Sequence, residues 1–324
     1  EIVLTGGGTE SNNLAIYGAA GSARGGRLVT SAIEHPSVLG AFQDLEARGF
    51  EVVRVPPTRN GVVEPEAVLE AAGPGTRLVS LMLANNEIGT LQPVAVVGRA
   101  LARRGVLFHC DAAQAAGKIP LVVADLAVDL MSIAGHKFGG PQGTGALYVR
   151  RGLVLQPHLR GGGQELNRRP GTENVAGIAG LGAAAAAAGR DLLEETARIA
   201  GLRDRLERAV LSNHPEARVN GSGAPRVPNT ASLSFDGMTG EALVIALDLE
   251  GFAVSAGSAC SAGTIRRSHV LEAMGLSDAA LSSIRISLGH GTTPADIEGL
   301  IAALGRVLER ARPASVVAPG RGTA

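Results

Sequence analysis

Residues 126–141 read LAVDLMSIAGHKFGGP, an apolar run followed by a lysine and a glycine-rich turn. The run from Leu126 to Ile133 is typical of a buried strand, and the Phe-Gly-Gly-Pro that ends the stretch cannot continue a helix. Lys137 is therefore expected on a turn at the carboxyl end of a strand, where α/β proteins place their cofactor sites. An ordinary surface lysine is the alternative interpretation.

Lysine is rare in this chain. Lys118 and Lys137 are the only lysines among 30 cationic residues, and the rest are arginine. Arginine can replace lysine wherever only a positive charge is needed, but its guanidinium stays protonated and cannot form an imine with an aldehyde. A lysine kept at the end of a strand therefore favours amine chemistry at position 137.

Short β-rich runs alternate with helix-length segments in the first half of the chain. We expect strands near 2–5, 27–31, 51–55, 77–83, 106–110, 128–133 and 145–149, and helices near 10–20, 37–48, 64–72 and 93–104. Strands separated by helices imply right-handed crossovers and a mostly parallel sheet. Residues 1–190 are therefore predicted to form a large α/β domain.

The second half of the chain has a different pattern. A helical stretch from Asn174 to about Leu211 precedes expected strands near 217–220, 230–235, 252–256 and 283–288 and expected helices near 239–250 and 294–311. Strands and helices no longer alternate cleanly, which predicts a smaller α+β domain over residues 191–312. The Pro-, Gly- and Ala-rich residues 313–324 are expected to be a disordered tail.

Composition excludes several classes of protein. The 324 residues are 45% hydrophobic with a formal net charge of zero and only 2% aromatic residues, so nucleic-acid binding has little support. No apolar segment reaches membrane-spanning length. Two cysteines, Cys110 and Cys260, form neither a disulfide framework nor a metal-ligand cluster, which suits a reducing compartment such as the cytoplasm.

The chain opens at Glu1 on a strand-like run, so we expect it to begin inside a fold, with any upstream targeting segment out of view.

The glycine-rich stretch Gly6-Gly7-Gly8-Thr9-Glu10-Ser11-Asn12 follows the first expected strand and opens a helix. Gly8 lets the backbone approach an anion closely, Thr9 adds a hydroxyl, and the helix N-terminus offers N–H groups with a positive dipole end. The stretch is neither a Walker loop nor the spaced glycine motif of dinucleotide sites. It predicts a phosphate cradle, and a plain glycine turn with a Thr or Ser cap is the alternative.

Polar residues follow three more strands at the same rim of the expected sheet. His35 could stack on a planar ring or move protons, although a polar helix cap is the commoner role. Asn86 lies in a turn that ends the next apolar run. Asp111 could hold a protonated ring nitrogen and Gln114 could donate to a neighbouring oxygen; a solvated loop aspartate is the alternative. Together with the amine of Lys137, this combination describes a pyridoxal phosphate site.

Two features of the second half add to this site. Cys260 lies in a run of small residues, within an expected loop of about 256–268 that could expose its sulfur. Cys110, within a strand-like run, fits the role of a small core residue better. Arg285 is expected on one face of a late strand, as a clamp for a substrate carboxylate or as part of a salt bridge.

In the order and spacing of its motifs, the chain resembles the cysteine desulfurases of the NifS/IscS type, which belong to the class V aminotransferase family. The resemblance rests on Gly-Gly-Thr-Glu-Ser-Asn-Asn, Glu-His-Pro, Asn-Asn-Glu-Ile-Gly, Asp-Ala-Ala-Gln, Gly-His-Lys and Gly-Ser-Ala-Cys, and it covers nearly the whole chain. It implies the type I fold of pyridoxal phosphate-dependent aminotransferases, usually as a homodimer.

The resemblance also implies a role for each matching residue. Lys137 would form the imine with the cofactor, Asp111 would pair with the pyridine nitrogen, and His35 would stack on the ring. Gln114 and Asn86 would approach the ring oxygen, Asn86 would also face the substrate, and Gly8, Thr9 and His136 would surround the phosphate. Thr172 would reach the phosphate of the partner subunit, and Arg285 would bind the substrate carboxylate.

The implied reaction takes sulfur from L-cysteine. Cys260 would attack the substrate sulfur, L-alanine would leave, and the persulfide would pass to an acceptor protein such as an iron–sulfur scaffold, or to tRNA thiolation. A free thiol titrates near pH ~8.5, so His35 is the candidate group to accept its proton. Another pyridoxal phosphate enzyme of the same fold and a non-catalytic sulfur-transfer scaffold are the alternatives.

Two departures from the family pattern stand out. Relatives commonly have a hydroxyl residue three positions before the lysine, where this chain has Ala134, and the N-terminal segment of the family is missing from this sequence. We therefore expect one phosphate hydrogen bond to be lost or supplied elsewhere. The residues around Cys260 match the branch with a long cysteine loop.

Overall fold

The computed structural model describes residues 1–21, 25–256 and 267–311. A seven-stranded sheet forms the first unit, with the strand order β1-β7-β6-β5-β4-β2-β3. Its strands are β1 (Ile2–Thr5), β2 (Arg27–Ser31), β3 (Glu51–Val55), β4 (Thr76–Ser80), β5 (Leu107–Asp111), β6 (Leu130–Ala134) and β7 (Gly145–Val149). β2 to β6 pair in parallel and β7 runs antiparallel to both β6 and β1, so the predicted mostly parallel sheet is confirmed.

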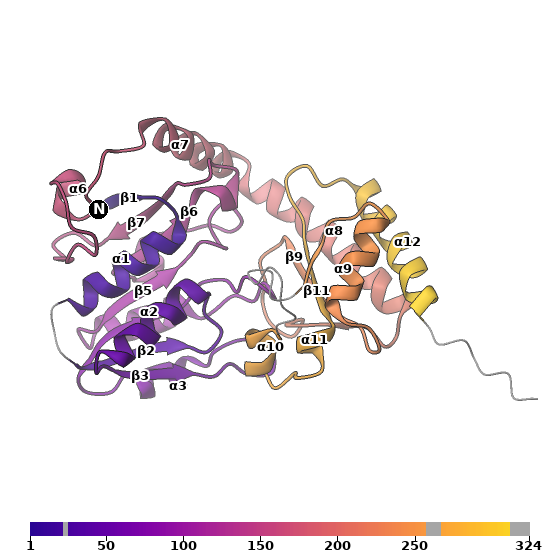
Figure 1. The fold of residues 1–324 in the computed structure, drawn as a ribbon, viewed down its shortest axis with the longest axis horizontal. Coiled ribbons are helices and arrows are strands. Elements are labelled where there is room, and N and C mark those ends of the chain that lie inside the picture. The colour runs from indigo at the N-terminus through magenta and orange to yellow at the C-terminus, as the bar shows by residue number, and fades with distance from the viewer. Residues whose placement is uncertain (22–24, 257–266, 312–324) are drawn as a thin grey trace, which may run out of the picture.

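Helices cover both faces of this sheet (Figure 1). Leu28 and Leu78 pack with α1 (Gly8–Ala20) and α2 (Pro36–Ala47), whereas their neighbours Val29 and Val79 pack with α3 (Pro65–Ala71) and α4 (Val94–Ala102). Successive side chains of a strand point to opposite faces, and a strand buried on both faces therefore reads as a continuous apolar run. The parallel strands carry their carboxyl ends to one rim, which is where the site lies.

The second unit is built on a four-stranded antiparallel sheet with the order β10-β11-β9-β8. Its strands are β8 (Arg218–Val219), β9 (Thr230–Ser234), β10 (Ser255–Ala256) and β11 (Ser283–Ser287). α7 (Val175–Arg190) and α8 (Leu192–Asn213) lead from the first unit to this sheet, which packs against α8, α9 (Gly240–Leu249) and α12 (Pro294–Ala311) around one apolar core (Figure 1). The predicted α+β character of this half is confirmed.

A late segment of the chain returns to the first unit. α10 (His269–Ala273) and α11 (Ala279–Ser282) follow the second unit's β10 in sequence. Their Val270, Leu271 and Ala280 nevertheless belong to the same buried cluster as Val29 and Val79 of the large sheet. This packing joins the two units beside the rim that carries the site. The predicted division between residues 190 and 191 stays a prediction.

The structure corrects the boundaries around the lysine turn. Residues expected to belong to one strand from Leu126 onward instead start in a short helix, α5 (Val123–Leu126). Ala127 ends that helix with φ 52°, and the strand begins only at Leu130. A residue in the left-handed conformation reverses the chain, so an apolar run can contain two elements. The short α6 (Gln164–Asn167), α10 and α11 were also not expected from the sequence.

Within the described ranges, no helix is both long and apolar enough to span a bilayer.

Candidate active site

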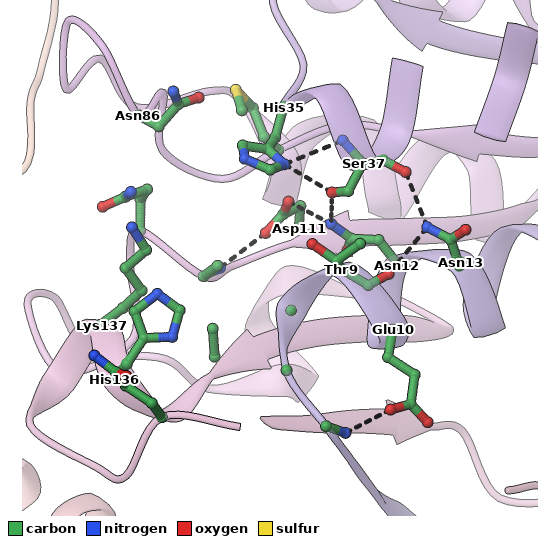
Figure 2. A pocket seen from close by; sticks show the side chains of 18 of the residues that line it. Thr9, Glu10, Asn12, Asn13, His35, Ser37, Asn86, Asp111, His136 and Lys137 are labelled. Carbon is green, nitrogen blue, oxygen red and sulfur yellow. Dashed lines mark hydrogen bonds between the residues drawn. The ribbon is translucent and has the colours of Figure 1, made fainter. Parts of the chain in front are cut away.

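A cavity of about 930 Å³ opens at the carboxyl rim of the large sheet. Nine residues that the sequence singled out line it, namely Gly8, Thr9, His35, Asn86, Asp111, Gln114, His136, Lys137 and Arg285. Figure 2 shows Lys137 and His136 on one side of the hollow, facing Asp111 and Thr9 on the other. The topology thus gathers residues from five separate rim turns and from β11 of the second unit at one place.

The glycine stretch enters α1 at this cavity. Gly7 is the N-cap of α1 with φ 149°, and a Cβ on it would meet no atom within 4 Å. The first N–H groups of a helix have no partner within the helix, so the start of α1 offers donors to an anion. Glu10 lies close by, but Arg169 pairs with its carboxylate at 2.7 Å and offsets its charge. The entrance of α1 is thus suited to bind a phosphate.

The Asp111 carboxylate is held by two donors. Asn12 Nδ2 donates to Oδ2 at 2.7 Å, and the backbone N–H of Ala113 donates to Oδ1 at 2.9 Å. Asn12 and Asp111 are both buried, so the carboxylate keeps one orientation. Asn12 lies 99 residues before Asp111 in the chain, and sequence reasoning gave it no role. A fixed carboxylate at this depth can accept a hydrogen bond from a protonated ring nitrogen.

His35 caps a helix, as one of the two alternatives predicted, and its role toward a planar ring stays a prediction. It is the N-cap of α2, where its Nδ1 accepts a hydrogen bond from the Ser37 backbone N–H at 3.1 Å, and it also lines the cavity. Burial lowers the pKa of His35, with Lys137 and His269 adding to the effect and Asp111 opposing it. A neutral imidazole at pH 7 follows from this environment, and such a ring is able to accept a proton.

The lysine turn is η1 (Gly135–Phe138), one turn of 3-10 helix directly after β6. Gly139 ends the turn with φ 86°, a conformation that favours glycine. The turn points Lys137 into the cavity beside His136 (Figure 2). Burial, with help from Lys137 and Lys118, lowers the pKa of His136. Ala134 lines the cavity next to Gly8, and its methyl side chain offers no hydrogen-bonding group.

Arg285 connects the second unit to the cavity. Its Nη1 donates to the Asn86 carbonyl at 2.8 Å, and its Nη2 lies 3.4 Å from Ser255 Oγ. Arg285 Nε and Asn86 Oδ1 are buried without a partner in the described part of the chain. Buried polar groups without partners are rare in folded proteins, and at the wall of a cavity they indicate a missing ligand. A guanidinium with a free donor suits a carboxylate.

Sequence reasoning missed a second group of contacts at the same rim. Ser268 Oγ donates to the buried carboxylate of Glu87, and His269 Nε2 lies 3.0 Å from the carbonyl of Glu34. Burial raises the pKa of Glu87, with the Ser268 hydrogen bond opposing the rise. The Asn-Asn-Glu motif was the available signal, but nothing in the sequence indicated that residues 181 positions apart would meet. These contacts attach the start of α10 to the site.

Three other predicted residues are not part of this cavity as described. Thr172 is exposed and does not line it, so its predicted contact with a partner subunit stays a prediction. Cys260 and most of its predicted loop, like the tail 313–324, lie outside the described residues. Cys110 is fully buried, and burial with Asp111 and Glu34 nearby raises the pKa of its thiol, which suits a core residue.

The donor set fits pyridoxal phosphate. The cavity is within the usual range of about 300–1,000 Å³ for small-molecule sites. It combines an amine, a fixed carboxylate, a neutral imidazole, the carboxamide of Gln114 and a helix N-terminus, each suited to one part of that cofactor. Among the described residues, no cluster could hold a metal ion.

Comparison with known proteins agrees with this geometry. The sequence pattern described as aminotransferase class-V matches residues 1–300. The chain belongs to this family, whose members depend on pyridoxal phosphate.

Its place in the family is among the cysteine desulfurases of the NifS/IscS type, as its motifs indicated. The cysteine desulfurase IscS of Dictyoglomus turgidum is 43% identical over 97% of this chain and 81% of its own length. A solved NifS-like protein superimposes with a TM-score of 0.87 at 36% identity, over 96% of this chain and 83% of that one. A structure of SspA in complex with cysteine superimposes with a TM-score of 0.76 at 36% identity, over 89% and 81%. The predicted fold class and family are confirmed.

Proposed function

We propose that this chain binds pyridoxal phosphate and removes the sulfur of L-cysteine, which yields L-alanine and a persulfide on Cys260. The observation that carries the proposal is the common cavity of Lys137, Asp111, His35 and Arg285. Relatives named cysteine desulfurase support it, and so does a relative solved in complex with cysteine.

Each cavity residue has a distinct task in this reaction. Lys137 would hold the cofactor through its amine and would take the proton from the α-carbon of the substrate. Asp111, fixed by Asn12, keeps the ring nitrogen protonated, and the N-terminus of α1 with Thr9 and His136 binds the phosphate. When bound, pyridoxal phosphate supplies an electron sink for the α-carbon. Arg285, which lines the cavity, would bind the carboxylate of the substrate through its guanidinium.

Sulfur transfer requires a thiolate at Cys260. His35 accepts the thiol proton, because its lowered pKa leaves the ring neutral at pH 7. The thiolate attacks the substrate sulfur, an S–S bond forms, and the bond between that sulfur and the β-carbon breaks. The electron pair stays on the β-carbon, which takes a proton, and Lys137 returns a proton to the α-carbon, so that L-alanine leaves.

We also propose a cytoplasmic homodimer that passes its persulfide sulfur to an acceptor protein. Exposed apolar side chains at one end of the first unit, among them Ile2, Leu166 and Val175, suit contact with a second copy. Sedimentation at twice 32.8 kDa would support the dimer, whereas a monomer at all concentrations would contradict it.

The test of the reaction uses three forms of the chain supplied with pyridoxal phosphate. The wild type should show a visible cofactor band that borohydride fixes on Lys137, and it should release alanine from L-cysteine. Cys260→Ser should keep the band and lose at least about 100-fold in alanine release, because the nucleophile is gone. Lys137→Ala should lose both signals. Alanine release at the wild-type rate by Cys260→Ser would refute the persulfide role.

A further inference from the structure

Lys118 is the second of only two lysines in the chain, and the proposed reaction gives it no task. It lines a second cavity of about 790 Å³, which adjoins the first and shares Gln114, Lys137 and Arg285 with it. A retained amine beside the reactive lysine therefore calls for its own chemical explanation.

Close packing fixes the segment that carries Lys118. A Cβ on Gly117, which has φ 71°, would lie 2.5 Å from Phe138 Cβ and 3.3 Å from Ala188 Cβ, so only glycine fits there. The segment thus lies directly against the turn that bears Lys137. Thr196 of α8 also donates to the Lys118 carbonyl at 2.8 Å. The backbone at Lys118 is held from two sides.

Among the residues that the structure describes, the Lys118 amine hydrogen-bonds to one residue, Gln114. Nζ donates to the side-chain oxygen Oε1 at 2.9 Å and to the Gln114 carbonyl at 3.0 Å. Within the described ranges, no carboxylate lies within ion-pair distance of Lys118. Burial lowers the pKa of Lys118 to about 7, and the nearby cations Lys137 and Arg285 add to the effect. An arginine here would keep its charge beside those two cations, whereas an amine can lose it and still donate.

The contact decides which end of the Gln114 carboxamide faces the cavity. A carboxamide has an oxygen that accepts and an N–H₂ group that donates, and the two ends can exchange by a flip. Lys118 engages the oxygen, which leaves the N–H₂ group for the cavity that Gln114 lines. An N–H₂ group is suited to an oxygen of a ligand, and the carboxamide oxygen would repel one.

We propose that Lys118 is a positioning residue of the cofactor site, which holds Gln114 with its N–H₂ group toward the ring oxygen of pyridoxal phosphate. The role rests on the proposed function, since it concerns the same cofactor. It needs no contact between Lys118 and the cofactor. Loss of the amine should therefore act only through the hydrogen bond that Gln114 makes.

The test compares two ligands, pyridoxal 5'-phosphate and its analogue without the 3-hydroxyl group, by equilibrium binding to the full chain. Lys118→Met should weaken binding of pyridoxal phosphate about tenfold and leave binding of the analogue within about twofold, because only the first ligand has the oxygen. Gln114→Leu should show the same pattern. The double variant should bind no more weakly than Gln114→Leu alone.

Two control variants separate positioning from charge and from folding. Arg190→Met removes an exposed cation from the same second cavity and should change neither affinity. Lys118→Arg keeps N–H donors but also a permanent charge beside Lys137 and Arg285, so it should recover only part of the preference for the 3-hydroxyl group. Equal weakening of both ligands by Lys118→Met, or additive losses in the double variant, would overturn the inference. If the wild type binds neither ligand, the proposed function itself fails, whereas binding that is insensitive to Lys118→Met refutes only this role.

Discussion

At the scale of single residues, Ser37 contacts the ring nitrogen Nδ1 of His35, and we expect it to influence which ring nitrogen carries the proton. Its Oγ lies 2.8 Å from His35 Nδ1 and accepts from Asn12 Nδ2 at 2.9 Å. If the ring carries its proton on Nδ1, it donates to the Ser37 oxygen and gives up the hydrogen bond that Nδ1 accepts from the Ser37 backbone N–H, and Nε2 is then able to take a proton. If the hydroxyl donates to Nδ1 instead, Nε2 carries the proton. A rotatable hydroxyl thus lets one ring serve in both states.

Ser37→Ala should therefore slow catalysis without disturbing the cofactor. Only the backbone N–H of residue 37 would then face Nδ1, and this donor favours the form of the ring that carries its proton on Nε2. In that form Nε2 cannot accept the proton of the thiol. We expect kcat for alanine release to fall about tenfold, within the usual contribution of acid–base catalysis, with an unchanged visible cofactor band. Ser37→Thr restores the hydroxyl and should recover most of the rate. An equal loss in both variants would assign the effect to packing.

At the scale of elements, the long helices and the central strands were predictable because they carry a clear period and are bounded by turn residues. Pro36 and Pro65 open α2 and α3, and the acceptor on Thr239 caps α9. The short helices were not predictable, since four or five residues are too few to show a period. α10 is one of these, with only five residues.

Part of the site was also predictable, because its residues lie at the ends of strands that the sequence reveals. Strand ends are visible in the sequence, and parallel strands bring them to one rim, which placed Asp111 and Lys137 together. Partners that meet only through tertiary packing were not visible: Asn12 with Asp111, and Glu87 with Ser268, are separated by 99 and 181 residues. Gln114 was recognised, but its contact with Lys118 within one turn was not.

Ser268 should stabilise α10 and its attachment to the rim. It is the N-cap of α10, where its Oγ accepts from the Leu271 N–H at 3.1 Å, and it donates to buried Glu87. Ser268→Ala removes a cap, which costs about 1 kcal/mol, and leaves a buried carboxylate short of a donor, which costs about 1–3 kcal/mol more. Urea unfolding should report a loss of roughly 2–4 kcal/mol in the free energy of unfolding.

Ser282→Ala is the matched control in the neighbouring helix. Its hydroxyl donates to the Asp278 carbonyl at the surface, and no buried carboxylate depends on it. Its removal should change the free energy of unfolding by less than about 0.5 kcal/mol. Equal effects of the two substitutions would show that the contact with Glu87 contributes nothing.

At the scale of the whole molecule, we expect Glu34 to make the stability of the fold depend on pH. Its side chain is fully buried; Oε1 accepts from Ser31 Oγ at 2.7 Å and from the Met82 N–H at 2.8 Å, and Oε2 has no partner among the described residues. Burial raises the pKa of Glu34 from 4.5 to about 8, with Asp111 adding a little and the two donors opposing the rise. The folded chain therefore keeps a proton here that the unfolded chain loses above about pH 4.5.

The free energy of unfolding should accordingly fall as pH rises from about 4.5 to 8, by at most about 1.4 kcal/mol per pH unit from this group, and level off above pH 8.

Glu34→Gln imitates the protonated acid, keeps an oxygen for Ser31 and Met82, and removes the titration. Urea unfolding between pH 5 and 9 should then show a shallower decline for Glu34→Gln than for the wild type, whereas Glu241→Gln, at an exposed position, should follow the wild type. Equal slopes for Glu34→Gln and the wild type would mean that Glu34 ionises in the fold as it does in water. A shallower slope would mean that the protein holds a neutral acid next to Asp111, so that a single carboxylate charge remains for the cofactor.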